Sequence, residues 1–279
     1  MTSRDHGHLP GQHGRLSLKL YGHPDRHDAI VTRYLPRLAD AVGSEARWWF
    51  LRYHDPDHHL RIRLTVPDGA FADAAAEVTA WSEQVCRAGL TARVQWDTYF
   101  PETARFGGRA AMDAAEAYFA ADSATALVQL TATTTRGGPN LHAMTGASLV
   151  DIAAAFLGDR ATAMRWLIKH TRADASPPER AIYDQAVRLA SPDDHEALAA
   201  HLAGEQIVSG WARRRQTLVT YRRALEEAGT LPPAVVLPDL LHLHHARMAS
   251  PSLDSERACL HLARAAALSW TARPRRSRP

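Results

Sequence analysis

The sequence predicts an α+β fold in which an antiparallel sheet, built from residues up to Tyr99, packs against a larger helical half. Three observations support this prediction. Apolar and polar residues alternate in several short segments before Tyr99, as they do in half-buried strands. Helical periodicity separates some of these segments and dominates from Gly107 onwards. The chain has 279 residues, of which 46% are apolar and 23% charged, so it can bury a substantial core.

The part of the chain before Gly107 is expected to form four strands and two helices. The strands are expected at residues 16–21, 47–53, 59–66 and 93–99, and the helices at 25–38 and 71–87. Asp25 is suited to cap the first helix because its carboxylate can accept a hydrogen bond from a free backbone N–H. The resulting order, βαββαβ, is that of the split βαβ or ferredoxin-like arrangement, in which the third strand lies inside the sheet beside the first.

The part of the chain after Phe106 is expected to be helical. Apolar residues recur there at helical spacing, and Gly, Pro and Ser interrupt the pattern at 158–159, 176–178, 191–193 and 232–233. The last two helices are expected at 237–248 and 252–270. We treat 1–279 as a single domain with a sheet half at 1–106, a helical half at 107–272 and a basic tail at 273–279.

The charge distribution argues against direct nucleic-acid or membrane binding. Four arginines lie in the tail, and without them the formal net charge changes from +3 to −1. A basic end of this kind is more often solvated than a binding arm. No apolar run approaches the roughly 20 residues that span a bilayer, and residues 1–12 lack the apolar core of a secretory signal. We therefore expect a cytoplasmic enzyme.

Several classes of chemistry lack their motifs in this sequence. There is no GxGxxG after a strand, no GxxxxGK[ST], no GxSxG and no HExxH, which argues against nucleotide, hydrolase and zinc-protease sites of those types. Cys86 and Cys259 lie far apart without CxxC spacing, so we expect both to be reduced, buried residues.

The most informative segment is the predicted strand that begins at His59. Alternation places Leu60, Ile62 and Leu64 on one face, and Arg61 and Arg63 on the other. An unpaired buried guanidinium is very costly, so the pair is expected either to bind an anion or to form ion pairs with carboxylates of the helical half. An arginine fork suits a carboxylate ligand. A polar cleft between the two halves is the expected site.

Two further segments could carry chemistry. Arg105 lies in the connection from the fourth strand to the helical half, where a solvated charge is the plainer interpretation. His242 and His245 can share a helix face as metal ligands do, but no third ligand accompanies them, so an acid–base histidine is favoured over a metal site. The cluster of His and Asp at 54–59 is interpreted mainly as turn chemistry.

Taken together, these segments resemble the C-terminal elimination domain of class I lanthipeptide dehydratases and its stand-alone thiopeptide relatives. The matching segments are 18–22 (LKLYG), 49–63, 105–108 (RFGG), 117–123 and the late helix with Leu241, His242 and Arg247. Each segment alone is weak, but their order and spacing along nearly the whole chain make the resemblance specific. Phe106 stands where the family's motif more often has tyrosine, so an aromatic ring is retained.

The resemblance implies elimination of glutamate from glutamylated Ser or Thr of a ribosomal precursor peptide, which leaves dehydroalanine or dehydrobutyrine. It implies that Arg61, Arg63, Arg105 and His242 are the catalytic residues, and we expect Arg52, Tyr53 and Arg247 to bind the substrate. It implies no metal and no organic cofactor. A separate tRNA-dependent glutamylation protein is expected to supply the glutamylated precursor peptide.

Three points stay open at this level. The resemblance does not decide whether His242 takes the α-proton or protonates the departing group. The same family includes pyridine synthases, which join two dehydroalanines by a formal [4+2] cycloaddition and expel the leader peptide, and a non-catalytic peptide-binding protein is a further alternative. A homodimer through an edge strand is compatible with such a sheet.

Overall fold

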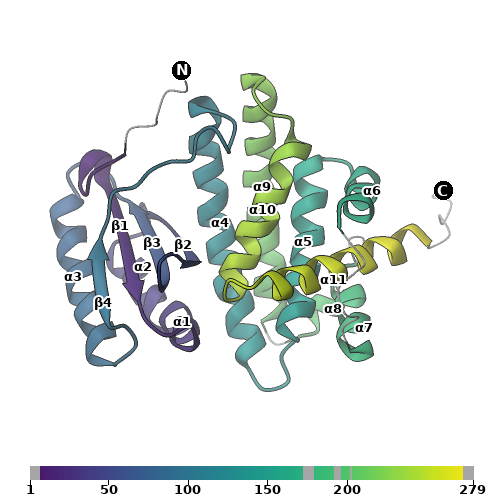
Figure 1. The fold of residues 1–279 in the computed structure, drawn as a ribbon, viewed down its shortest axis with the longest axis horizontal. Helices are drawn as coiled ribbons and strands as arrows, with labels where there is room; N and C mark the ends of the chain where they lie inside the picture. Colours follow the sequence, from purple (N-terminus) through teal and green to yellow (C-terminus); the bar gives the residue numbers. More distant parts are fainter. Residues whose placement is uncertain (1–6, 172–178, 192–195, 202, 273–279) are drawn as a thin grey trace.

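The computed structural model describes residues 7–171, 179–191, 196–201 and 203–272. The predicted basic tail at 273–279 lies outside the described residues, as do the predicted breaks at 176–178 and 192–193. A four-stranded antiparallel sheet and a larger set of helices lie side by side, which confirms the predicted α+β class (Figure 1).

The sheet consists of four strands in the order β2-β3-β1-β4, and all neighbours are antiparallel. The strands are β1 (Arg15–Tyr21), β2 (Arg47–His54), β3 (His58–Thr65) and β4 (Arg93–Trp96). β3 lies in the interior of the sheet beside β1, as the sequence predicts. β4 is shorter than predicted, and Tyr99 instead forms an isolated bridge with His8.

Short helices cover the apolar face of this sheet. They are η1 (Gln12–Gly14), η2 (Pro24–Arg26), α1 (His27–Ala29), the π-helical turn η3 (Ile30–Tyr34), α2 (Leu35–Ala41) and the longer α3 (Phe71–Arg87). The side chains of Leu60, Ile62 and Leu64 are buried in the common core, so the predicted orientation of this strand is confirmed. His23, not Asp25, caps η2, because its ring nitrogen accepts the Asp25 N–H at 3.4 Å.

The helical half follows the sheet in sequence. Its helices are α4 (Arg109–Thr134), α5 (Leu141–Leu157), α6 (Arg160–His170), α7 (Arg180–Leu189), α8 (Glu196–Ala199), α9 (Gly204–Ala228), α10 (Pro233–Met248) and α11 (Leu253–Ala272). Helices α4 and α10 pack against β2, which would otherwise be an exposed edge of the sheet. The Phe50 N–H of β2 donates to Ser123 Oγ of α4 at 3.2 Å. None of the described helices is long and apolar enough to cross a bilayer.

The two cysteines differ from one another. Cys259 is buried, as predicted, but the prediction that Cys86 is buried is wrong. Cys86 follows the buried Val85 on α3, and a step of one residue turns its side chain to the solvent face of the helix. Both are free thiols.

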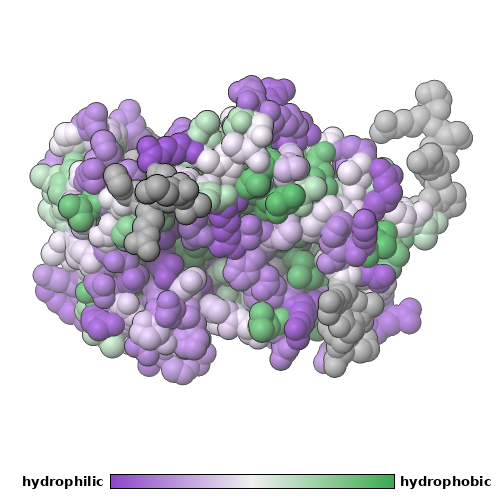
Figure 2. Space-filling view, turned by 45° about the horizontal axis from the view of Figure 1, so that its top comes forward, coloured by the Kyte–Doolittle hydropathy of each residue, from purple (hydrophilic) through white to green (hydrophobic). Residues whose placement is uncertain are grey.

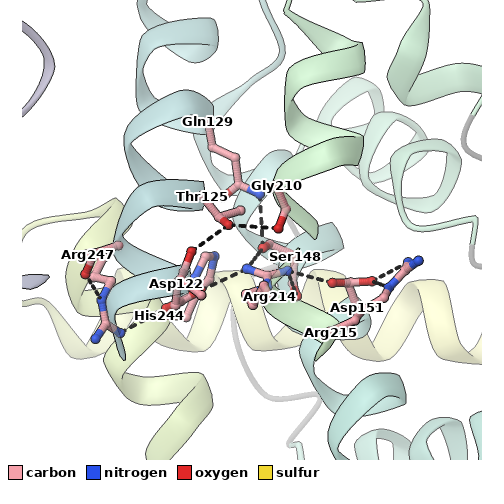
Figure 3. Close-up of polar contacts among 12 residues, drawn as sticks. Asp122, Thr125, Gln129, Ser148, Asp151, Gly210, Arg214, Arg215, His244 and Arg247 are labelled. Carbon is pink, nitrogen blue, oxygen red and sulfur yellow. Dashed lines mark hydrogen bonds and ion pairs between the residues drawn. The ribbon is translucent and has the colours of Figure 1, made fainter. Parts of the chain in front are cut away.

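A buried ionic network joins the helices of the C-terminal half (Figure 3). Asp122 of α4 accepts hydrogen bonds from Arg214 of α9 at 2.9 Å, from His244 of α10 at 2.8 Å and from Arg247 of α10 at 2.9 Å. All four side chains are fully buried. Burial alone would raise the pKa of Asp122, but its three partners hold that pKa well below its usual value.

The network extends in both directions from Asp122. Arg214 also donates to Asp151 of α5 at 2.7 Å and to Ser148 at 2.8 Å. On the other side, Arg247 donates to Ser123 Oγ at 2.9 Å, the same hydroxyl that accepts the Phe50 N–H of the sheet. The network therefore connects α5, α9, α4 and α10 to the sheet.

We expect Asp122→Asn to destabilise the protein by about 3–5 kcal/mol, because it leaves two buried guanidinium groups without their shared carboxylate. Urea denaturation with linear extrapolation measures this change. Asp254→Asn on α11 is the control, since the Asp254 side chain is 95% exposed, and it should leave the midpoint unchanged. Equal midpoints for both variants would contradict the central place of Asp122.

Candidate functional site

The sheet face opposite the apolar side chains of β1 and β3, here called the open face, carries polar and aromatic residues in cross-strand rows. Residues directly opposite one another in paired strands form these rows. The first row crosses all four strands and contains Arg93, Tyr21, His59 and Tyr53. The second contains Gln95, Lys19, Arg61 and Leu51, and the third contains Ser17, Arg63 and Trp49. The predicted arginine pair thus lies in two adjacent rows of one face.

Arg61 is held in place by neighbouring rings. Its Nε–H donates to His59 Nε2 at 3.1 Å, and its Cζ lies 3.5 Å from the centre of the Tyr53 ring. His59 can accept this bond because its Nδ1–H donates to the Asp57 carbonyl at 2.8 Å, and because burial lowers the pKa of the ring and keeps it neutral. No carboxylate among the described residues pairs with Arg61, so its terminal nitrogens remain available to a ligand.

Arg63 lies deeper and stacks on another ring. Its Cζ is 4.5 Å from the centre of the Tyr99 ring, and its buried Nε has no hydrogen-bond partner in the described part of the chain. Burial lowers the pKa of this guanidinium, while nearby Glu102 and Glu116 act in the opposite direction. Glu116 is itself bound by Arg15 at 2.9 Å and by the Tyr99 hydroxyl at 2.7 Å. The alternative that Arg61 and Arg63 form direct ion pairs with the helical half is therefore not what the described residues show.

Arg105 is anchored between the two halves, in contrast to the plainer expectation of a solvated charge. It donates to Glu102 at 2.9 Å and to Asp239 of α10 at 2.6 Å. The hydrogen bond to Asp239, assisted by Glu102, raises the pKa of Arg105. The turn that follows requires glycine, because Gly107 has φ +91° and a Cβ there would approach Leu225 to 2.0 Å.

His242 projects from α10 and contacts α11. Its Nδ1 lies 2.9 Å from Glu256 Oε1, and this hydrogen bond is the main cause that raises the pKa of His242. Arg105 and Asp239 also act on His242 electrostatically, so the predicted Arg105 and His242 share one neighbourhood. His245 has a different partner, Ser255 Oγ at 3.0 Å, and its pKa is lowered to about 4, mainly by burial.

The three residues expected to bind substrate lie in different surroundings. Tyr53 is on the open face, 38% exposed, beneath Arg61. Arg52 and Arg247 are buried: Arg52 pairs with Asp28 at 2.6 Å and donates to the Arg247 carbonyl at 3.1 Å. The guanidinium of Arg247 belongs to the Asp122 network. The structure therefore places these two arginines in the junction between the halves and not on the open face.

Glu102 links the two groups of predicted residues. Its carboxylate binds Arg105 and also acts electrostatically on Arg63. The charge of Arg61 acts on Arg63 as well. Hydrophilic side chains gather on the face where the sheet half meets the helical half (Figure 2).

A cavity of about 290 Å³ lies elsewhere, among α5, α7 and α9, lined by residues that include Asp151, Trp211 and Arg215. None of the predicted site residues lines it, so it is not the cleft expected between the halves.

The chain matches a family model described as the C-terminal part of the lantibiotic biosynthesis dehydratase over residues 16–267. The chain belongs to this family. A 110-residue segment is 26% identical to the subtilin biosynthesis protein SpaB of Bacillus subtilis, and covers 39% of the chain and 11% of SpaB. The chain thus spans only a small part of this lantibiotic relative.

Two solved structures resemble this member of the lantibiotic dehydratase C-terminal family. The tRNA dependent lantibiotic dehydratase MibB from Microbispora sp. 107891 matches with a TM-score of 0.81 and 27% identity, over 94% of this chain and 28% of MibB. The pyridine synthase TbtD from thiomuracin biosynthesis matches with a TM-score of 0.61 and 17% identity, over 92% of this chain and 98% of TbtD. At 17% identity the second similarity concerns the fold alone.

Several polar residues next to the predicted site residues have weak signals in the sequence. The sequence predicts turn chemistry for His59, although the alternation that places Arg61 and Arg63 on one face includes it as well. Glu102 lies three residues before Arg105, a spacing that can indicate a local ion pair. Asp239 and Glu256 carry no local signal, because each meets its partner from another helix or loop.

A buried neutral histidine of this family member lies close to the site. His27 is 1% exposed, and burial, reinforced by the charge of Arg52, lowers its pKa from 6.5 to about 3. The folded protein therefore keeps His27 neutral where the unfolded chain already binds a proton. The free energy of unfolding is unaffected above pH 6.5 and falls as the pH drops from about 6.5 towards 3.

We expect His27→Phe to reduce this acid sensitivity, which for one such group is up to about 1.4 kcal/mol per pH unit. Urea denaturation at pH values between about 4 and 8, roughly one unit apart, measures the slope of the unfolding free energy against pH. His170→Phe at the exposed end of α6 serves as the control and should keep the wild-type slope. A His27→Phe slope as steep as that of the wild type would contradict the assignment.

Proposed function

We propose that this protein eliminates glutamate from glutamylated Ser or Thr side chains of a ribosomal precursor peptide, leaving dehydroalanine or dehydrobutyrine. The observation that carries the proposal is the pair Arg61 and Arg63, two neighbouring guanidinium groups without a direct carboxylate partner in the described residues. Membership of the lantibiotic dehydratase C-terminal family and the similarity to MibB support it.

The arginine pair suits a glutamyl group. The group carries one carboxylate from the start, and its ester oxygens gain negative charge as the bond to Cβ breaks. Arg61 and Arg63 can bind the free carboxylate and stabilise the negative charge on the ester oxygens. A guanidinium that is fixed before the reaction needs little reorganisation. Arg61 is fixed by Tyr53 and His59, and Arg63 by Tyr99.

Arg105 contributes differently, because Glu102 and Asp239 already occupy part of its guanidinium. A guanidinium has five N–H donors, so donors remain for the substrate after these two contacts. The two carboxylates fix its direction between the open face and α10. In the proposed reaction Arg105 orients the departing glutamate towards Arg63.

We infer that His242 is the base. Its Nδ1–H points to Glu256, which leaves the Nε2 lone pair free to take a proton. The Cα–H electron pair forms the Cα=Cβ bond, the Cβ–O bond breaks, and glutamate leaves as a carboxylate while the proton moves to Nε2. A carboxylate is a good leaving group without protonation, so removal of the α-proton is the step that needs help.

The glutamylated peptide would come from a separate tRNA-dependent glutamylation protein, and the reaction would take place in the cytoplasm. The similarity to MibB, a tRNA dependent lantibiotic dehydratase, supports the first of these. We also propose that the sheet half is a ferredoxin-like unit, which the strand order β2-β3-β1-β4 supports.

The central experiment incubates a glutamylated core peptide with the protein and follows mass. We expect loss of glutamate together with formation of a dehydro residue. Arg61→Ala and His242→Ala should lower the rate by about 10² or more and leave peptides that retain glutamate. Arg165→Ala, on the exposed surface of α6, should behave as the wild type.

Other outcomes separate the alternatives. Release of the leader from an already dehydrated peptide would identify a pyridine synthase, for which the two available guanidinium groups have no glutamate to bind. Peptide binding without any mass change would indicate a non-catalytic protein. Wild-type rates for both variants would place the site elsewhere.

Glu256→Gln tests the role of the His242 partner. Glu256 is the chief cause that raises the pKa of His242, so the variant should lower that pKa. The limb of the pH profile in which kcat/KM rises with pH should then move to lower pH. The limiting rate above this limb should fall by about tenfold, since the base is weaker. Asp254→Asn, on the same helix, should change neither. An unshifted limb in Glu256→Gln would mean that His242 does not act as the base.

A further inference from the structure

The first row of the open face is a line of aromatic rings in contact across three strands. Tyr21 and His59 have ring centres 4.9 Å apart, and His59 and Tyr53 have ring centres 5.7 Å apart. A guanidinium lies over each outer ring: Arg93 Cζ is 4.0 Å from the centre of Tyr21, and Arg61 Cζ is 3.5 Å from the centre of Tyr53. The two cation–ring contacts thus lie at the two outer rings, with His59 between them.

The rings form the floor of this row, and the cations lie above it. Tyr21 is 8% exposed and His59 is fully buried, whereas Arg93 is exposed and Arg61 half-buried. A ring holds a guanidinium by its π electrons and leaves its charge and its N–H groups for other partners. Stacking therefore orders both cations without neutralising them.

The charges around the row differ in their availability. Lys19, in the next row between these arginines, forms an ion pair with Asp97 at 2.7 Å. Neither Arg93 nor Arg61 forms an ion pair with a described carboxylate. The open face therefore presents Arg93 as a cationic position separate from Arg61, which belongs to the site of the proposed elimination.

We propose that Arg93, stacked on Tyr21, binds an acidic side chain of the precursor peptide while Arg61 holds the glutamyl group. This inference rests on the proposed function. Tyr21 and Tyr53 lie on the two strands that flank β3, so the two cations are on the order of 10 Å apart, two strand spacings. An extended peptide advances about 3.3 Å per residue. The acidic residue therefore lies about two to four residues from the glutamylated one.

The test uses synthetic glutamylated peptides that differ only in the position of one Asp, at one to six residues on either side of the modified residue. On one side, Asp two to four residues away should lower KM about tenfold relative to the Ala peptide, with kcat unchanged. Arg93→Gln should abolish this difference, and Arg93→Glu should transfer the preference to a peptide with Lys at that position. Arg180→Gln, an exposed arginine on α7, should retain the wild-type preference.

Fluorescence anisotropy with the same peptides, unmodified and labelled, separates this inference from the proposed function. If Asp raises the affinity and Arg93→Gln removes this effect, the proposed role of Arg93 is supported even if no peptide loses glutamate. If all peptides lose glutamate with the same KM and bind with equal affinity, the proposed role of Arg93 is wrong, while the proposed elimination stands. Tighter, Arg93-dependent binding of a short single-stranded RNA than of any peptide also overturns the proposed role of Arg93, because the row would then be a phosphate and base platform.

Discussion

The carboxylate of Asp122 is the centre of the ionic network that fixes the helices next to the sheet. It meets two guanidinium groups and an imidazole in a region without solvent, and it thereby ties α4 to α9 and α10. Buried ion pairs of this kind add little net stability over apolar packing, but an arrangement that separates the partners leaves a buried charge uncompensated and is strongly disfavoured. Because α10 also carries Asp239 and His242, the position of the Arg105 region follows from that arrangement.

The arginines of this protein are held in two distinct ways. Arg15, Arg52 and Arg214 are paired with carboxylates, and their charge is used within the fold. Arg61, Arg63 and Arg93 lie on aromatic rings instead. A ring orders a guanidinium without cancelling its charge, which is the condition for binding an external anion. What sets these three arginines apart is therefore that no described carboxylate pairs with them, because Arg15 and Arg214 also lie near rings but are neutralised by carboxylates.

The features that could be predicted from the sequence are those set by local period. Alternation correctly divides residues 60–64 into an apolar and a basic face, because a strand repeats every two residues. What the sequence does not indicate is long-range partners. Arg52 and Arg247 stay predicted substrate-binding residues, but their ion pairs with Asp28 and Asp122 place them in the junction, which no local pattern indicates. Glu256 meets His242 because the first turns of α11 lie beside α10, and no local pattern encodes that contact.

Two histidines, His59 and His242, must be neutral for their proposed roles, but their pKa values are shifted in opposite directions. His59 must accept the Arg61 N–H through Nε2, and a protonated ring would instead repel the guanidinium. Burial lowers the pKa of His59, which favours this neutral form. His242 must be neutral to act as a base, yet Glu256 raises its pKa. The two pKa values are thus shifted in opposite directions, so as the pH falls the proposed base His242 is protonated before His59, which orients Arg61.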